Sequence, residues 1–123
     1  MRTSLRSLLA VLALGCGSTP VSPDGPGLEG LVARGPITPV CDPSVSCDAP
    51  FAADFEVLRN NVPVASFRSS AAGYYRVSLQ PGNCVVRPAP TAPLLHPTTQ
   101  TRAVEIQPAG WTRVDLLFDT GIR

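Results

Sequence analysis

The sequence predicts an all-β domain, a seven-stranded antiparallel β-sandwich, and three observations support this class. The most regular alternation lies at residues 74–80, where Tyr75, Val77 and Leu79 fall on one side of an extended chain and polar side chains fall on the other, as in a half-buried strand. The 123 residues include 14 prolines and 10 glycines, which end strands and form turns. No window repeats apolar residues at the spacing of an amphipathic helix. Short strands joined by tight turns are expected to form two sheets packed face to face.

The first two strands are expected on either side of a long loop. The first ends at Gly35, because Pro36 follows, and the second runs from Phe51 to Arg59. The inner face of the first strand carries Leu28, Gly30 and Val32. In the second strand, Phe51, Ala53, Phe55 and Val57 form an apolar face, and Ala52, Asp54, Glu56 and Leu58 form a mixed outer face.

A hairpin is expected to follow the second strand. Asn60 and Asn61 both tolerate positive φ, as the two central positions of a type I′ turn require. The return strand would run from Val62 to Ser69. Because Pro63 cannot donate a ladder hydrogen bond, this strand is expected at a sheet edge or to begin after the proline.

Four further strands complete the predicted sandwich. Turns at residues 70–73 and 81–83 bound the strand that holds Tyr75. The next strand places Cys84 and Val86 on its inner face, and the last two run from Arg102 to Gln107 and from Trp111 to Asp119. The core positions of these last two strands are expected to be Val104, Ile106, Val114, Leu116 and Phe118.

The N-terminal segment MRTSLRSLLAVLALGCGS has the pattern of an export signal. Arg2 and Arg6 give it a basic start, and the apolar run that follows, residues 8–14, is far shorter than the roughly 20 residues that a membrane-spanning helix needs. Such a segment is expected to be removed during export. Residues 1–15 are therefore predicted to be a signal peptide.

The end of this segment, Ala13-Leu14-Gly15-Cys16, resembles the lipobox of bacterial lipoproteins. The resemblance implies that Cys16 is diacylated on its sulfur, becomes the new N-terminus and anchors the chain to membrane lipid. It also implies the outer membrane, because Gly17 stands where aspartate would signal retention in the inner membrane. An ordinary signal peptide cleaved nearby, with Cys16 unmodified, is the alternative.

Residues 16–26 are expected to form a flexible linker, and residues 27–123 the folded domain. The linker is short, polar and rich in proline, so it cannot bury enough apolar area to offset the entropy of ordering. Its expected role is to tether the domain to the lipid anchor.

Two cysteines lie in a proline-rich loop from Ile37 to Pro50, here called the disulfide loop. Because an exported chain meets an oxidising compartment, Cys41 and Cys47 are predicted to form a disulfide. The rival interpretation is zinc bound by these cysteines with Asp42, Asp48 and His96, but structural zinc sites draw closely paired ligands from two clusters. The sequence has no second cluster, so no metal or other cofactor is expected.

Cys84 remains unpaired once Cys16 is acylated. Its inward position predicts a buried thiol that behaves as a small hydrophobe. A bridge to Cys41 or Cys47, or a disulfide-linked dimer, stays open as an alternative.

The order of these features resembles the carboxypeptidase regulatory-like domains, which are β-sandwiches of the transthyretin-like type. Their hallmark is a D-x-x-G-x-F turn, a strand and a P-G-x-Y turn, matched here by Gly73, Tyr75, Pro81 and Gly82. Ser70 replaces the acidic residue and Cys84 the second aromatic one. The resemblance covers most of residues 28–123 and implies the transthyretin-like topology.

The function expected from these features is that of a non-catalytic binding or accessory module of the cell envelope. A protein or glycan partner would meet the disulfide loop and a second irregular stretch from Arg87 to Gln100, here called the histidine loop. A net charge of +1 gives no basis for nucleic-acid binding. Asp54 and Glu56 are interpreted as a solvated outer face rather than a catalytic pair.

Two alternative functions fit the sequence less well. A transthyretin-like hydrolase would resemble a family with several histidines and a C-terminal Y-R-G-S signature, whereas this chain has one histidine, His96, and ends differently. A unit cross-linked by an isopeptide bond needs lysine, and the sequence contains none.

Overall fold

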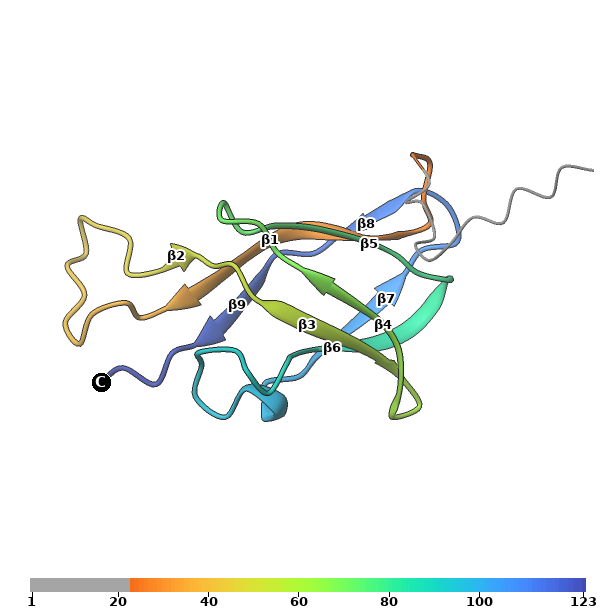
Figure 1. Ribbon diagram of the computed structural model, residues 1–123. Coiled ribbons are helices and arrows are strands. Elements are labelled where there is room, and N and C mark those ends of the chain that lie inside the picture. Colours follow the sequence, from red (N-terminus) through yellow and green to blue (C-terminus); the bar gives the residue numbers. More distant parts are fainter. Residues whose placement is uncertain (1–22) are drawn as a thin grey trace, which may run out of the picture.

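The computed structural model describes residues 23–123, which form two β-sheets packed face to face (Figure 1). The predicted signal peptide, Cys16 and most of the linker lie outside the described residues. The elements in chain order are β1 (Gly27–Gly35), β2 (Ala49–Pro50), β3 (Asp54–Arg59), β4 (Val62–Arg68), β5 (Tyr74–Ser78), β6 (Gly82–Pro88), the 3-10 helix η1 (Pro97–Thr99), β7 (Arg102–Ile106), β8 (Trp111–Arg113) and β9 (Leu116–Asp119). Among residues 23–123, no helix is long and apolar enough to cross a membrane.

The first sheet is built around β1. The N-terminal half of β1 pairs with β5 on one side and β8 on the other, and its C-terminal half pairs with β2 and β9. β5 and β2 run antiparallel to β1, whereas β8 and β9 run parallel to it. The prediction of purely antiparallel sheets was therefore wrong for this sheet, because the last strands pair with the first strand of the domain rather than with their sequence neighbours.

A break between β8 and β9 divides the strand predicted from Trp111 to Asp119. At the break, the carboxylate of Asp115 takes the place of a backbone acceptor, because its Oδ1 accepts a hydrogen bond from the N–H of Leu31 at 2.9 Å. The carbonyl oxygen of Val114 turns towards β1, where a Cβ added to Gly30 would lie only 2.0 Å from it. Only glycine fits this close approach.

The second sheet is antiparallel, with the strand order β4-β3-β6-β7. The β3–β4 hairpin turns at Asn60 and Asn61, whose φ values are +51° and +63°, so the predicted turn is confirmed. β4 lies at the edge of the sheet, as Pro63 predicted. One residue of β4, Val64, has no partner on β3, and such a β-bulge bends a hairpin and increases its twist.

The chain crosses between the sheets at residues 51–53, and this crossing explains why β3 begins at Asp54 rather than at Phe51. The N–H of Phe51 donates to the carbonyl of Val32 in the first sheet, at 3.1 Å. The N–H of Ala53 donates to Oγ of Ser69 at 3.0 Å. The two-residue strand β2 and the division of β8 from β9 give nine strands in residues 23–123, not the seven predicted.

The core lies between the sheets and holds the inward residues that the alternation predicted. Phe55 is fully buried, and its ring centroid lies 5.1 Å from that of Phe67, 5.5 Å from that of Phe118 and 6.1 Å from that of Phe51. Val114, at the break, is only partly buried. The other buried core residues are Leu28, Val32, Ala53, Val57, Tyr75, Val77, Leu79, Cys84, Val86, Ala92, Val104, Ile106 and Leu116.

Candidate functional site

The two ends of the sandwich differ in what they carry. The described chain begins at one end, where the indole N–H of Trp111 donates to the carbonyl of Pro23 at 3.2 Å and the guanidinium of Arg76 lies 4.2 Å from the centre of the Trp111 ring. β1 then runs the length of the first sheet to the disulfide loop, which projects from the opposite end (Figure 1). The last two residues of that loop form β2.

The predicted disulfide is present between Cys41 and Cys47, whose Cα atoms lie 5.5 Å apart. The loop is also fastened by a hydrogen bond from the N–H of Ile37 to the carbonyl of Cys47, at 2.8 Å. The backbone N–H and the hydroxyl of Ser44 both donate to Asp42, and these bonds hold the pKa of the Asp42 carboxyl below its usual range. Among residues 23–123, no cluster of three or more His, Cys, Asp or Glu side chains could hold a metal ion.

The disulfide loop exposes large apolar side chains. Val40 is 84% exposed, Val45 66% and Ile37 43%. Leu95 and Ile122, on the neighbouring histidine loop and C-terminal segment, are also exposed. Exposed apolar residues that gather at one end of a small domain are typical of a contact surface.

The histidine loop is fastened to the end of β9 by a backbone hydrogen bond from the N–H of Leu95 to the carbonyl of Asp119, at 3.2 Å, and by the side chain of Gln100. The amide of Gln100 donates to the carbonyls of Leu95 and Asp119, at 2.6 and 2.9 Å, and its oxygen accepts the N–H of Asp119 at 2.7 Å. His96 is exposed and precedes η1. The first two residues predicted for this loop belong instead to β6.

Thr120 connects this arrangement to the base of the disulfide loop. Its N–H donates to the carbonyl of Gly35 at 3.1 Å, and its hydroxyl donates to the carbonyl of Pro36 at 2.6 Å. The two loops that the sequence singled out therefore spring from one hydrogen-bonded end of the domain.

Cys84 is a free thiol, only 4% exposed, so the predicted buried state is confirmed and a bridge to Cys41 or Cys47 is wrong. Burial raises the pKa of the thiol, and the neighbouring guanidinium of Arg59 partly opposes this shift. Arg59 itself donates to the carbonyls of Gln80 and Pro81. A buried thiol in the neutral form packs as a small hydrophobe.

The acidic residues of β3 lie on the outer face of the second sheet. Asp54 pairs with Arg68 at 3.1 Å, and Glu56 pairs with Arg87 at 2.9 Å. Their separate cationic partners agree with the interpretation of a charged outer face.

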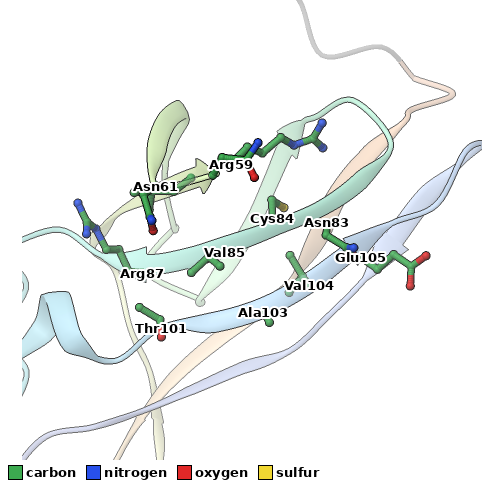
Figure 2. Close-up of a pocket in the computed structure, with 12 residues that line it drawn as sticks. Arg59, Asn61, Asn83, Cys84, Val85, Arg87, Thr101, Ala103, Val104 and Glu105 are labelled. Atoms are coloured by element: carbon green, nitrogen blue, oxygen red, sulfur yellow. The ribbon is translucent and has the colours of Figure 1, made fainter.

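A pocket on the outer face of the second sheet was not anticipated from the sequence. It has a volume of about 520 Å³ and lies over β6 and β7, beside the tip of the β3–β4 hairpin (Figure 2). The one available signal was the alternation in β3, which placed an apolar residue, Leu58, on the outer face. The lining residues are Leu58, Arg59, Asn60, Asn61, Asn83, Cys84, Val85, Arg87, Thr101, Ala103, Val104 and Glu105.

Comparison with known proteins identifies no family. No protein-family model matches the chain, and no curated protein matches it significantly.

Proposed function

We propose that this chain is a lipid-anchored, non-catalytic binding module of the bacterial cell envelope. In this proposal Cys16 carries the lipid, the outer membrane holds the anchor, and the two-sheet domain is a carboxypeptidase regulatory-like sandwich of the transthyretin-like type. The partner is a protein or a glycan that meets the disulfide loop and the histidine loop.

The observation that carries the proposal is that Pro23, where the described chain begins, and these two loops lie at opposite ends of the domain. Pro23 lies seven residues after Cys16, and seven extended residues span at most about 25 Å. An anchor at Cys16 would therefore keep the Pro23 end of the domain close to the lipid. The disulfide loop, at the other end of β1 (Figure 1), would face away from the membrane.

The disulfide loop also suits binding energetically. Its cystine and its hydrogen bonds restrict the loop before any partner arrives, so less conformational entropy is lost on association. The exposed side chains of Val40 and Val45 supply apolar area that a partner would bury. At about 25 cal/mol per Å² of apolar area, such side chains are the natural anchors of an interface.

The lipid anchor is tested by metabolic labelling with a fatty-acid analogue. The wild-type chain should carry the label and fractionate with outer membranes, and Cys16→Ser should lose both properties. A Cys16→Ser variant that still carries label, or wild-type chain released into the medium without detergent, would refute the anchor.

The binding surface is tested by crosslinking in intact cells of the source bacterium. Wild-type chain should recover one stoichiometric partner, and a Val40→Asp/Val45→Asp variant should lose most of it. Val62→Asp/Val64→Asp is the matched control, because these valines are similarly exposed but lie on β4. Equal loss in both variants would remove the disulfide loop from the proposal, and hydrolysis of a substrate by the purified chain would favour the transthyretin-like hydrolase instead.

A further inference from the structure

The pocket on the second sheet has an apolar floor made by three adjacent strands. Val85 of β6 is paired with Leu58 of β3 on one side and with Ala103 of β7 on the other, so these three side chains share the outer face. Leu58 is only 7% exposed, yet it does not belong to the core cluster between the sheets. The second sheet therefore buries an apolar side chain on the face that a two-layer sandwich normally leaves to solvent.

The apolar floor is surrounded by polar side chains that make no hydrogen bond within the described part of the chain. They are the amides of Asn60, Asn61 and Asn83, the hydroxyl of Thr101 and the carboxylate of Glu105. None of these side-chain groups hydrogen-bonds to another group of residues 23–123. The contrast is the amide of Gln100, which makes three hydrogen bonds that fasten a loop. Unused donors and acceptors around an apolar floor are typical of a ligand site.

Three charged side chains line the pocket, those of Arg59, Arg87 and Glu105. The guanidinium of Arg59 donates to the carbonyls of Gln80 and Pro81, and the other two charges, of opposite sign, stand at the two ends. Figure 2 shows Arg87 at one end and Glu105 at the other. Glu56 accepts a hydrogen bond from Nε of Arg87 at 2.9 Å, which orients the guanidinium and leaves its two Nη groups as donors. Glu105 is paired in register with Asn83, four residues before Arg87, so the backbone positions of Glu105 and Arg87 lie about 13 Å apart along the strands.

We propose that this pocket binds a short peptide in extended conformation, with its N-terminal ammonium group at Glu105 and its C-terminal carboxylate at Arg87. Each extended residue spans 3.3–3.6 Å, so three or four residues match a separation of about 13 Å. The amides of Asn61 and Asn83 each offer a donor and an acceptor, which a peptide group requires. The apolar floor accommodates a small apolar side chain. This site does not depend on the lipid anchor or on the disulfide loop.

Other ligand classes fit the pocket less well. A simple anion would meet the carboxylate of Glu105 as well as the cations Arg59 and Arg87. A sugar ring packs its apolar face on aromatic side chains in many binding sites, and none of the 12 lining residues is aromatic. A free peptide uses the opposite charges of Arg87 and Glu105 and the asparagine amides.

The proposal is tested by isothermal titration calorimetry with the full chain in detergent and tri-alanine as the probe. Tri-alanine with free termini should bind saturably in the millimolar range or tighter. N-acetylation of the peptide should weaken binding about fivefold, since it removes one exposed charge pair. Glu105→Gln should weaken binding of the free peptide by the same factor, and acetylation should then cause no further loss.

Controls separate this result from general electrostatics and from misfolding. Asp48→Asn removes an exposed carboxylate at the other end of the domain and should leave the affinity unchanged. Both variants should keep the circular-dichroism spectrum and melting temperature of the wild-type chain, since both positions are exposed. The proposal is overturned by the absence of saturable binding, by independent losses from acetylation and Glu105→Gln, or by maltotriose binding more tightly than tri-alanine.

Discussion

The hydrophobic core and the disulfide loop are stabilised by different interactions. In the core, Phe55 contacts three other rings and is completely buried, so its position follows from burial and close packing. In the disulfide loop, the largest apolar side chains face solvent, and the loop is closed by a cystine and a few hydrogen bonds. Because the cystine closes the loop, its side chains do not have to be buried to hold its shape.

The contrast explains where this small domain can carry a binding surface. Residues in the core cannot change without leaving a void or an overlap. Val40 and Val45 are mostly exposed and do not belong to the core cluster, so a partner can determine which side chains are favoured there. Experiments that compare the two regions should show one dominated by packing and the other by chain closure.

The largest expected effect is on the core. Phe55→Ala should lower the free energy of unfolding by about 3–5 kcal/mol, because the lost contacts are followed by a cavity. Urea denaturation monitored by circular dichroism measures the change. A loss below about 1 kcal/mol would mean that the site collapses freely and that the core is not closely packed.

Removal of the cystine should have a smaller effect. Cys41→Ser/Cys47→Ser should lower the free energy of unfolding by about 2 kcal/mol, the chain-entropy value for a short loop. Amide exchange should become faster in the disulfide loop while the relative protection of β3 and β6 is kept. An unchanged stability would show that the hydrogen bonds of the loop restrict it without the cystine.

Tyr75 connects the core to the break between β8 and β9, because its hydroxyl donates to the carbonyl of Val114. Burial, and then the charge of Asp115, raise the pKa of Tyr75 well above its ordinary value. The unfolded chain then ionises at lower pH than the folded one, so the free energy of unfolding should fall above about pH 10, by up to about 1.4 kcal/mol per pH unit.

Tyr75→Phe provides the control for this pH dependence. It should cost about 1 kcal/mol at neutral pH, through the lost hydrogen bond, and should remove most of the alkaline slope. Urea denaturation between pH 8 and about pH 11 measures both. A slope that persists in Tyr75→Phe would assign it to other groups.

The smallest expected effect is at the exposed ion pair between Asp54 and Arg68, whose side chains are both more than half exposed. Asp54→Asn should change the free energy of unfolding by less than about 0.5 kcal/mol, because solvent screens such pairs. A larger loss, measured by the same denaturation, would place part of the stability on the outer face of the second sheet.

Local pattern predicted the faces of the strands well, because alternation reports directly on burial. It placed Cys84 inside the core and identified the turn at Asn60 and Asn61. It also predicted that β4, with Pro63, lies at an edge. Each of these three predictions depends only on a few consecutive residues, so it can be made directly from the sequence.

Pairing partners could not be predicted in the same way. The apolar alternation continues from Val114 to Phe118, yet the strand breaks, since Asp115 bonds to β1 and Gly30 lets the Val114 carbonyl approach. Gly30, a glycine on the core face of a strand, was the available signal of a close backbone contact. The pocket could not be predicted for a related reason: its residues come from β3, β6, β7 and the loops beside them, and they meet only when the second sheet has formed.

The central place of β1 has a consequence for how the chain reaches its destination. β1 is completed by β8 and β9, whose residues follow it by more than 80 positions. Pairings over such separations slow folding, so the first sheet closes only after nearly the whole domain has been delivered. If the chain is exported, as proposed, slow formation of the first sheet would keep the chain unfolded during translocation. The native state would then form after the chain has crossed the membrane.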